Sequence, residues 1–474
     1  MVMGEFTQET QVLVIGGGPG GYAAAFRAAD LGLEVTLVDM EGRLGGVCLY
    51  RGCIPSKTLL YVTELLHDAQ RAGEMGIVFG EPRIHLDGVR VWKNRVIEKL
   101  AGGLTELARR RGVQVVKGRA IFEGSDRVRL LDSDVAHMKF KYAVIATGSR
   151  AITIPVTNEK KGGRIMTSTG ALALAEIPER LLVIGGGYVG VELGMVYGSL
   201  GSRITLVESS ERLMAGADPD LVQPLNQRLQ DLFESVYINT RVIRLAETET
   251  GIEATLGGSA PHGRQSFDRA LVAIGRQAYS QNLGLENTRV KCDDHGFILV
   301  DERMRTSDER IFAVGDVVGG VMLAHKAMHE GKVAAEVISG KNVAFDYQTI
   351  PAVVYTDPQI AWCGLTEQEA KRQNRPVRVS RFPWSASGRA ATMGIGKGLT
   401  KFVIDEETGR ILGMGIVGRE AGEMISEGVL AVEMGALAED VALTMHPHPT
   451  LAESEEEAAE AFLGSSTHIL PQKK

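Results

Sequence analysis

The sequence predicts an α/β protein with two Rossmann-like dinucleotide-binding domains followed by a C-terminal α+β domain. A glycine-rich strand–turn–helix unit occurs twice, and after residue 345 short β-rich stretches alternate with helical ones. The length of 474 residues is enough for two to four domains with buried cores. We place the domains at residues 1–150, 151–275, 276–345 and 346–474.

The first glycine-rich unit begins with an apolar run, Gln11 to Ile15, which we expect to form a strand. Six residues rich in glycine follow, then a predicted helix over 22–31 and a second strand over 34–38 that ends at Asp39. This order is the G-x-G-x-x-G fingerprint of a βαβ unit, with an acid 18 residues after the last motif glycine. The glycines let backbone N–H groups approach a pyrophosphate, and the acid accepts hydrogen bonds from a ribose.

The same unit recurs 169 residues later. At this offset Gly16, Gly18, Gly21 and Asp39 correspond to Gly185, Gly187, Gly190 and Glu208. A predicted buried strand ending in glycine closes each unit, at Gly148 and at Gly275. Glu208 would repel a 2′-phosphate about 4 Å away by about 4 kcal/mol at an effective dielectric constant of 20. The second unit is therefore predicted to bind NAD rather than NADP, and two different dinucleotides imply electron transfer between them.

A further buried strand ends in Gly-Asp at Asp316. An acid at the carboxyl edge of a parallel strand is well placed to bind a ligand, and the alternative is a cap for the helix expected around 322–339. Between the two units, residues 55–71 and 87–111 are predicted to be helical, the second as an ordinary amphipathic helix.

Cys48 and Cys53 lie five positions apart among glycines. On an ideal helix their Cα atoms would be about 8.7 Å apart, and a disulfide requires roughly 4.4–6.8 Å. A bridge therefore needs a distorted loop or first helical turn. As a structural staple so short a loop would contribute only about 2 kcal/mol, and the usual spacing of metal ligands is absent. The pair is best interpreted as redox-active.

His448 is followed five residues later by Glu453, at the start of a predicted helix. The acidic run Glu453 to Glu457 is expected to be the solvated first turn of that helix, stabilised by the helix dipole. A histidine oriented by a carboxylate is the usual arrangement of a general base. A surface loop or a weak metal site remain alternatives.

The charge, the cysteine content and the N-terminal residues exclude several classes of protein. A net charge of −7 argues against non-specific binding to nucleic acid or anionic membranes. The remaining cysteines, Cys292 and Cys363, are expected to be buried, inert thiols. Met1 to Thr10 shows no secretion or transit signal, and the nearly uncharged stretch Leu181 to Leu200 fits a buried strand–turn–helix better than a membrane span. A reducing, cytoplasmic location is expected.

With these motifs in this order, the chain resembles the flavin disulfide oxidoreductases, class I of the pyridine nucleotide-disulfide oxidoreductase family. Within them it is most similar to the dihydrolipoamide dehydrogenases, from about residue 8 to 470. The most specific stretches are CLYRGCIPSKTLL (48–60), GDVVGGVMLAHKAMHEG (315–331), residues 350–358, FPWSASGRA (382–390) and HPHPTLAE (446–453).

The resemblance implies two cofactors and a role for each predicted residue. The FAD residues would be Gly16, Gly18, Gly21, Asp39, Lys57, Gly148, Asp316 on the ribitol, and Ala324. The NAD residues would be Gly185, Gly187, Gly190, Glu208 and Gly275. Cys53 would face the flavin and Cys48 would exchange with dihydrolipoamide, while Lys57 would lie near flavin N5, paired with Glu192. His448 of the partner subunit, held by Glu453, would be the base.

The resemblance also implies partners. The third domain would form the interface of a homodimer, and the substrate would be a lipoylated acyltransferase or lipoyl-carrier protein of a 2-oxoacid dehydrogenase or glycine-cleavage system. The sequence departs from the family at Tyr50, where Asn is usual, at 277–279, where Arg-Pro-Asn is common, and at Pro447. Another NADH-dependent flavin disulfide reductase and a non-catalytic assembly flavoprotein remain alternatives; Glu208 disfavours the NADPH-dependent reductases of the glutathione type.

Overall fold

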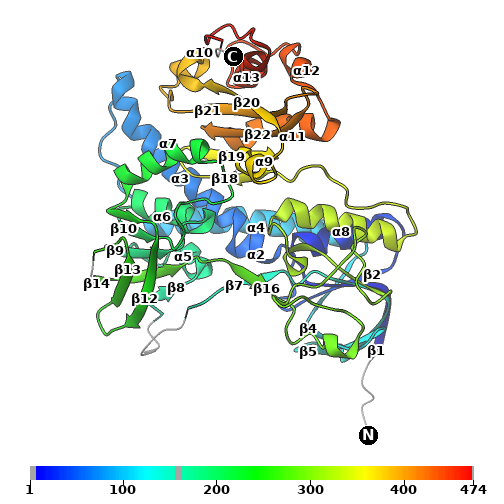
Figure 1. Cartoon of the computed structure of the whole chain (residues 1–474). Helices are drawn as coiled ribbons and strands as arrows, with labels where there is room; N and C mark the ends of the chain where they lie inside the picture. Colours follow the sequence, from blue (N-terminus) through cyan, green and yellow to red (C-terminus); the bar gives the residue numbers. More distant parts are fainter. Residues whose placement is uncertain (1–6, 155–162, 262, 472–474) are drawn as a thin grey trace.

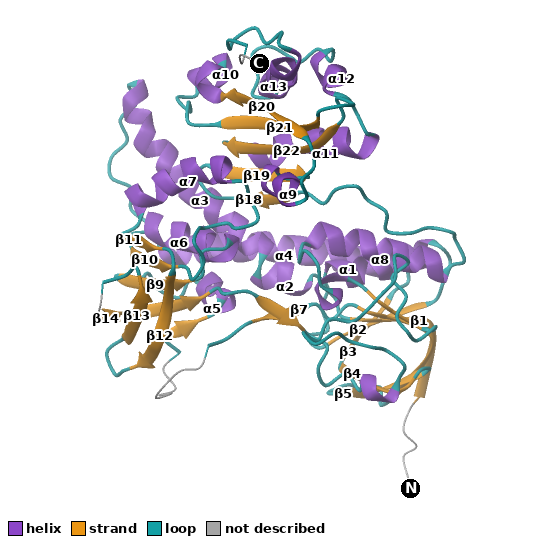
Figure 2. Cartoon of the chain, in the orientation of Figure 1, coloured by secondary structure: helices purple, strands orange, loops and turns teal. Residues whose placement is uncertain are grey.

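The computed structural model describes residues 7–154, 163–261 and 263–471 (Figure 1). The first six residues of the N-terminal stretch, in which no targeting signal was expected, lie outside the described residues. Two α/β units, each a sheet with its helices, lie side by side, and a third sheet with its own helices lies at one end of the molecule (Figure 2). This arrangement confirms the predicted fold class.

The first unit is built on a seven-stranded sheet. Its strands are β1 (Thr7–Ile15), β2 (Val35–Asp39), β3 (Gln114–Lys117), β4 (Arg119–Gly124), β5 (Arg127–Leu131), β6 (His137–Ile145) and β17 (Ile311–Ala313). Their order is β3-β2-β1-β6-β5-β4, with β17 also paired to β6. The pairs of β1 with β2, β2 with β3, β1 with β6, and β6 with β17 are parallel, so the carboxyl ends of these strands meet at one edge.

Five helices accompany this sheet. They are α1 (Pro19–Asp30), α2 (Gly46–Arg51), α3 (Cys53–Arg71), α4 (Leu86–Arg110) and α8 (Ala324–Ile338). The backbones of α1 and α8 approach closely, because a Cβ on Gly331 would lie only 2.3 Å from the carbonyl oxygen of Gly20. The segment that contains β17 and α8 therefore packs on the first unit, although more than 150 residues separate them.

The second unit has an all-parallel sheet in the order β11-β10-β9-β15-β8. Its elements are β8 (Ile165–Met166), α5 (Ser168–Ala173), β9 (Arg180–Ile184), α6 (Tyr188–Ser199), β10 (Arg203–Val207), α7 (Pro219–Leu232), β11 (Ser235–Tyr237) and β15 (Arg269–Val272). Strand β9 and helix α6 form the predicted buried strand–turn–helix. Within the described ranges, no helix has the length and apolar character needed to cross a bilayer.

Two small sheets flank the second unit. One contains β12 (Thr240–Glu247), β13 (Ile252–Gly258) and β14 (Arg264–Phe267), all antiparallel. The other pairs β7 (Ser149–Ala151) with β16 (Arg276–Ala278), where the chain leaves the first unit and later returns to it.

The C-terminal part is an antiparallel sheet in the order β18-β19-β22-β21-β20 with helices around it. Its elements are β18 (Ala352–Val354), β19 (Gln359–Gly364), α9 (Glu367–Arg372), β20 (Val377–Pro383), α10 (Gly388–Thr392), β21 (Leu399–Asp405), β22 (Ile411–Gly418), α11 (Ala421–Met434), α12 (Ala438–Ala442) and α13 (Glu453–Leu463). The β-rich and helical stretches predicted to alternate after residue 345 are present. The first turn of α13 was predicted to be solvated, and this was wrong: Glu455 and Glu457 are buried, because α13 packs against β20 and β21.

The two isolated cysteines behave differently. Cys363, in β19, is buried as predicted. Cys292 is exposed, so the prediction that it is buried was wrong. The physical reason is that Cys292 lies outside the strands and forms only an isolated bridge with Ile298, on a surface segment that supplies no second layer to cover it.

Candidate active site

A cleft lies where the first and second units meet, at the carboxyl edge of the first sheet. It is lined by α1, the α2–α3 junction, α6 and the turn after β17. The predicted residues on its wall are Gly16, Gly18, Asp39, Cys48, Cys53, Lys57, Gly148, Glu192, Asp316 and Ala324. Gly21 does not line the cleft; it supports the wall from within α1, because a Cβ there would lie 1.8 Å from the carbonyl oxygen of Gly16.

The turn between β1 and α1 forms a cradle of bare backbone. Gly16 has a φ of +108°, and a Cβ on Gly46 would lie 2.6 Å from the Cα of Gly18. Asp39, at the end of β2, accepts a hydrogen bond from the N–H of Gly17 at 2.9 Å. A helix N-terminus with no side chains in front of it and a carboxylate beside it fits the pyrophosphate and ribose of a dinucleotide.

Asp316, which follows β17, lines the same cleft. Ser149 donates a hydrogen bond to its carboxylate, and the Nε atom of Arg276 lies 3.8 Å away. Arg276 also donates to the hydroxyl of Ser149 at 2.6 Å. Asp316 is thus held toward the cleft and does not cap α8, whose N-cap is Leu323. Sequence reasoning missed Ser149 and Arg276, although each directly follows one of the two strand-closing glycines.

The two cysteines lie on either side of a helix break. Cys48 belongs to α2, Cys53 begins α3, and Gly52 separates them. A Cβ on Gly52 would lie 3.3 Å from the Cα of Cys48, so a glycine allows the two short turns to approach. Both thiols are half-buried and free here, and they are in hydrogen-bond contact. The break provides the distorted geometry that a bridge across five positions requires.

The surroundings of the two thiols give them different pKa values. The hydrogen bond from Cys48 lowers the pKa of Cys53 to about 7; burial opposes this, and the positive charge of Lys57 assists it. The same hydrogen bond and burial raise the pKa of Cys48. Of the two thiols, Cys53 is therefore the one that ionises more readily, and Cys48 is the one that retains its proton.

Lys57 and Glu192 form the predicted ion pair across the boundary between the two units. The Nζ atom of Lys57 lies 2.7 Å and 3.0 Å from the carboxylate oxygens of Glu192, which is almost fully buried on α6. The backbone N–H of Tyr355 donates to the same carboxylate at 2.9 Å, and the ring of Tyr355 lies 4.7 Å from Nζ. Sequence reasoning missed Tyr355, which joins the C-terminal part to this pair.

Tyr50, the unusual residue of the dithiol loop, has a structural explanation. Its hydroxyl donates to the carbonyl oxygen of Leu44 at 3.1 Å, and the guanidinium of Arg43 lies over its ring at 3.7 Å. These contacts close the loop that leads into α2, so the tyrosine braces the segment that carries Cys48.

A second cleft surrounds the glycine turn of the second unit and includes Gly185, Gly187, Glu208 and Gly275. Gly190 again supports it from behind, because a Cβ there would lie 2.0 Å from the carbonyl oxygen of Gly185. Glu208 accepts a hydrogen bond from the N–H of Gly186 at 2.6 Å, as Asp39 does from Gly17. Burial works against ionisation, but this bond and those from Ser210 lower the pKa of Glu208. The cradle fits a second dinucleotide, with a carboxylate at the ribose.

Besides Arg276, which lines this second cleft too, sequence reasoning missed three further arginines on its wall, Arg212, Arg241 and Arg244. They lie in loops and strands with no glycine motif nearby, so only the fold brings them to the nucleotide cradle.

The predicted base is oriented as expected but stands apart from the dithiol. The Nδ1 atom of His448 lies 2.6 Å from Glu453, whose second oxygen accepts the N–H of Thr450 at 2.7 Å. The His448 side chain is 75% exposed, and neither residue lines the dithiol cleft of its own chain. A histidine held by a carboxylate on an open surface is suited to reach into a second molecule.

Comparison with known proteins agrees with this geometry. The family model of the pyridine nucleotide-disulphide oxidoreductases matches residues 10–331, and that of their dimerisation domain matches residues 350–459. The dihydrolipoyl dehydrogenase of Vibrio parahaemolyticus is 46% identical over 468 residues, 98% of both chains. That of Geobacillus stearothermophilus is 44% identical over 471 residues, 99% of this chain and 100% of the relative.

Solved structures are also similar to this chain over nearly its whole length. LpdA from Mycobacterium tuberculosis superposes with a TM-score of 0.88 at 26% identity, covering 96% of this chain and 99% of that one. The HOCl-induced flavoprotein disulfide reductase RclA from Escherichia coli superposes with a TM-score of 0.84 at 26% identity, covering 95% and 99%. The chain therefore belongs to the pyridine nucleotide-disulphide oxidoreductase family.

Proposed function

We propose that this protein is an NAD-dependent dihydrolipoyl dehydrogenase, which oxidises protein-bound dihydrolipoyl groups through a Cys48–Cys53 disulfide, FAD and NAD. The observation that carries the proposal is the asymmetric thiol pair beside Lys57 and Glu192, at the junction of two dinucleotide cradles. The dihydrolipoyl dehydrogenases that match over nearly the whole chain support the choice of substrate.

Each cradle would hold one cofactor. FAD would lie on Gly16, Gly18, Gly21, Asp39, Gly148, Asp316 and Ala324, with Lys57 beside its reactive ring. NAD would lie on Gly185, Gly187, Gly190, Glu208 and Gly275. When bound, FAD supplies a two-electron carrier between the thiols and NAD. Glu208 selects NAD because its ionised carboxylate occupies the place of a 2′-phosphate.

The thiols would divide the work of dithiol exchange. One substrate thiolate attacks Cys48 in the disulfide form, giving a mixed disulfide and releasing Cys53 as a thiolate. The second substrate sulfur then attacks the mixed disulfide, which forms the cyclic lipoyl disulfide and frees Cys48. Cys53 is the better leaving group because its pKa is about 7. Lys57 stabilises the Cys53 thiolate, and Glu192 holds Lys57 in place.

His448 of the partner subunit would remove the proton of the second substrate thiol, with Glu453 stabilising the imidazolium that forms. This role needs a homodimer in which the C-terminal domain contacts the other copy. The match of residues 350–459 to a dimerisation domain supports that assembly.

The proposed function also includes a domain division, a partner and a location. We divide the chain into an FAD domain (1–150), an NAD domain (151–275), a central segment that completes the FAD site (276–345) and a dimerisation domain (346–474). The partner would be a lipoylated acyltransferase or lipoyl-carrier protein of a 2-oxoacid dehydrogenase or glycine-cleavage system, in the cytoplasm.

Anaerobic titration of the holoenzyme with dihydrolipoamide and then NAD tests the proposal. We expect a long-wavelength charge-transfer band between the Cys53 thiolate and the flavin, followed by NADH formation, with NADH formation lost in Cys48→Ser. A protein that accepts electrons only from NADPH, or that ignores dihydrolipoamide while reducing glutathione disulfide, would refute it.

A further inference from the structure

The two nucleotide cradles are closed by equivalent loops that are anchored differently. In the first unit the N–H of Gly45 donates to the carbonyl oxygen of Gly17 at 2.7 Å, and in the second the N–H of Met214 donates to that of Gly186 at 3.1 Å. The positions differ by the repeat offset of 169. Each loop is therefore hydrogen-bonded directly to its glycine turn.

The two loops lead into different segments. After Gly45 the chain continues into α2, which carries Cys48. After Met214 it continues into α7, whose N-cap is Asp218. The second loop, residues 209–217, also packs against the glycine turn, since a Cβ on Gly186 would lie 2.4 Å from the side chain of Leu213.

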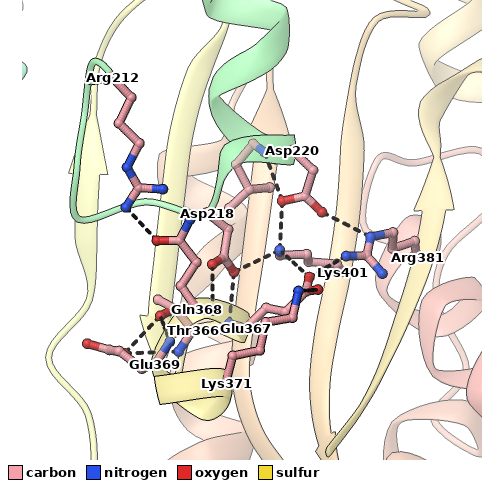
Figure 3. Close-up of polar contacts among 11 residues, drawn as sticks. Arg212, Asp218, Asp220, Thr366, Glu367, Gln368, Glu369, Lys371, Arg381 and Lys401 are labelled. Atoms are coloured by element: carbon pink, nitrogen blue, oxygen red, sulfur yellow. Dashed lines mark hydrogen bonds and ion pairs between the residues drawn. The ribbon is translucent and has the colours of Figure 1, made fainter. Parts of the chain in front are cut away.

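The end of this second loop is bound by a charge cluster around the buried side chain of Lys401, the Lys401 cluster (Figure 3). Its members are Asp218 and Asp220 from the second unit and Glu367, Arg381 and Lys401 from the C-terminal part. The Nζ atom of Lys401, a side chain only 1% exposed, lies 2.8 Å from Asp218, 2.7 Å from Asp220 and 3.5 Å from Glu367. Arg381 lies 2.9 Å from Asp220 and also pairs with Glu367.

Two further contacts tie the loop to α9. The carboxylate of Asp218 accepts the N–H groups of Glu367 and Gln368 at 3.0 and 3.1 Å. Arg212, which lines the second cleft, donates to the side chain of Gln368 and to the carbonyl oxygen of Ala215 at 2.6 Å. The loop is thus held at one end by Glu208 and the glycine turn and at the other by the C-terminal part.

We propose that the Lys401 cluster and Gln368 are positioning residues for NAD. They hold loop 209–217 against the glycine turn, so that the C-terminal domain sets the affinity of the second cradle for its nucleotide. Only the name of the ligand rests on the proposed function. The Lys401–Asp218 pair is buried on both sides, and a buried pair is screened little by salt, so this contact persists at physiological ionic strength.

The test compares three variants of the holoenzyme by titrating NAD calorimetrically into the oxidised protein. Lys401→Met keeps the length of the side chain and removes its charge, and we expect a rise in the Kd for NAD of about 5- to 30-fold, a usual range for coupling between separate sites. Gln368→Ala removes the acceptor for Arg212 at a half-buried site, and we expect a smaller rise, at least twofold. Lys93→Met is the matched control, because Lys93 is also buried but bonds the carbonyl oxygen of Leu172; its Kd should not change.

The second measurement is the rate at which dihydrolipoamide reduces the flavin without NAD, which we expect to be unchanged in Lys401→Met and Gln368→Ala. An unchanged Kd in both, or an equal loss in this NAD-independent rate, overturns the inference. If Lys401→Met does not fold, Gln368→Ala decides alone. A wild-type protein that binds NAD but does not oxidise dihydrolipoamide would refute the proposed function and leave this inference standing.

Discussion

Removing the charge of Lys57 tests whether the Lys57–Glu192 pair sets the chemistry of the dithiol. Lys57 follows Cys53 by four residues on α3, so the two side chains are neighbours on one helix face. Glu192 stands behind Lys57 at 2.7 Å and partly neutralises it. The two charges therefore act on the Cys53 thiolate with opposite signs.

The magnitude follows from Coulomb's law. Unit charges about 6 Å apart at an effective dielectric constant of 20 interact by about 3 kcal/mol, which corresponds to a change of about 2 in a pKa. Because the Lys57 side chain is 30% exposed and solvent screens part of its field, we expect Lys57→Met to raise the pKa of Cys53 by about 1–2. Glu192→Gln should lower it by about 1, because Lys57 then acts without its counter-ion.

The assay is a pH titration of the charge-transfer absorbance in enzyme reduced by two electrons. Lys57→Arg serves as the control, because it keeps the charge and should stay near the wild-type midpoint. Shifts of the same sign in Lys57→Met and Glu192→Gln, or a shift below about 0.3 in both, would show that the pair does not act electrostatically on Cys53.

Three other outcomes are expected. Cys48→Ser should abolish NADH formation from dihydrolipoamide yet retain electron transfer from NADH to an artificial dye; retained NADH formation would place Cys48 outside the exchange step. His448→Gln should slow dithiol oxidation by roughly 2–4 orders of magnitude with normal FAD content, and near-normal turnover would exclude it as the base. Glu455 is 1% exposed without a hydrogen-bond partner, and burial raises its pKa to about 9 from 4.5. Between these values the unfolded chain releases a proton that the folded protein keeps, so stability falls as pH rises. The gain in unfolding free energy in Glu455→Gln should grow by about 1 kcal/mol per pH unit from pH 5 to 8; a pH-independent gain would contradict it.

The local motifs could be predicted from the sequence because the geometry of each depends on residues close together along the chain. The glycine turns, Asp39 and Glu208 lie within single βαβ units, and both acids accept the N–H of the middle glycine of their own turn. The ion pair of Lys57 with Glu192, 135 residues apart, was expected only through a family resemblance. The burial of Cys292 was predicted from residue type alone, and the prediction failed because burial depends on what packs against a segment.

The sequence by itself determined the two cradles, the redox pair between two helix turns and the orientation of His448 by Glu453, since each depends on residues near one another along the chain. Only the tertiary structure decided which distant groups complete the sites. Ser149 and Arg276 meet Asp316, the N–H of Tyr355 bonds Glu192, and Lys401 pairs with Asp218 at the end of the loop of the second cradle. These contacts join segments more than 100 residues apart, whose meeting is set by sheet order and helix packing rather than by any local pattern.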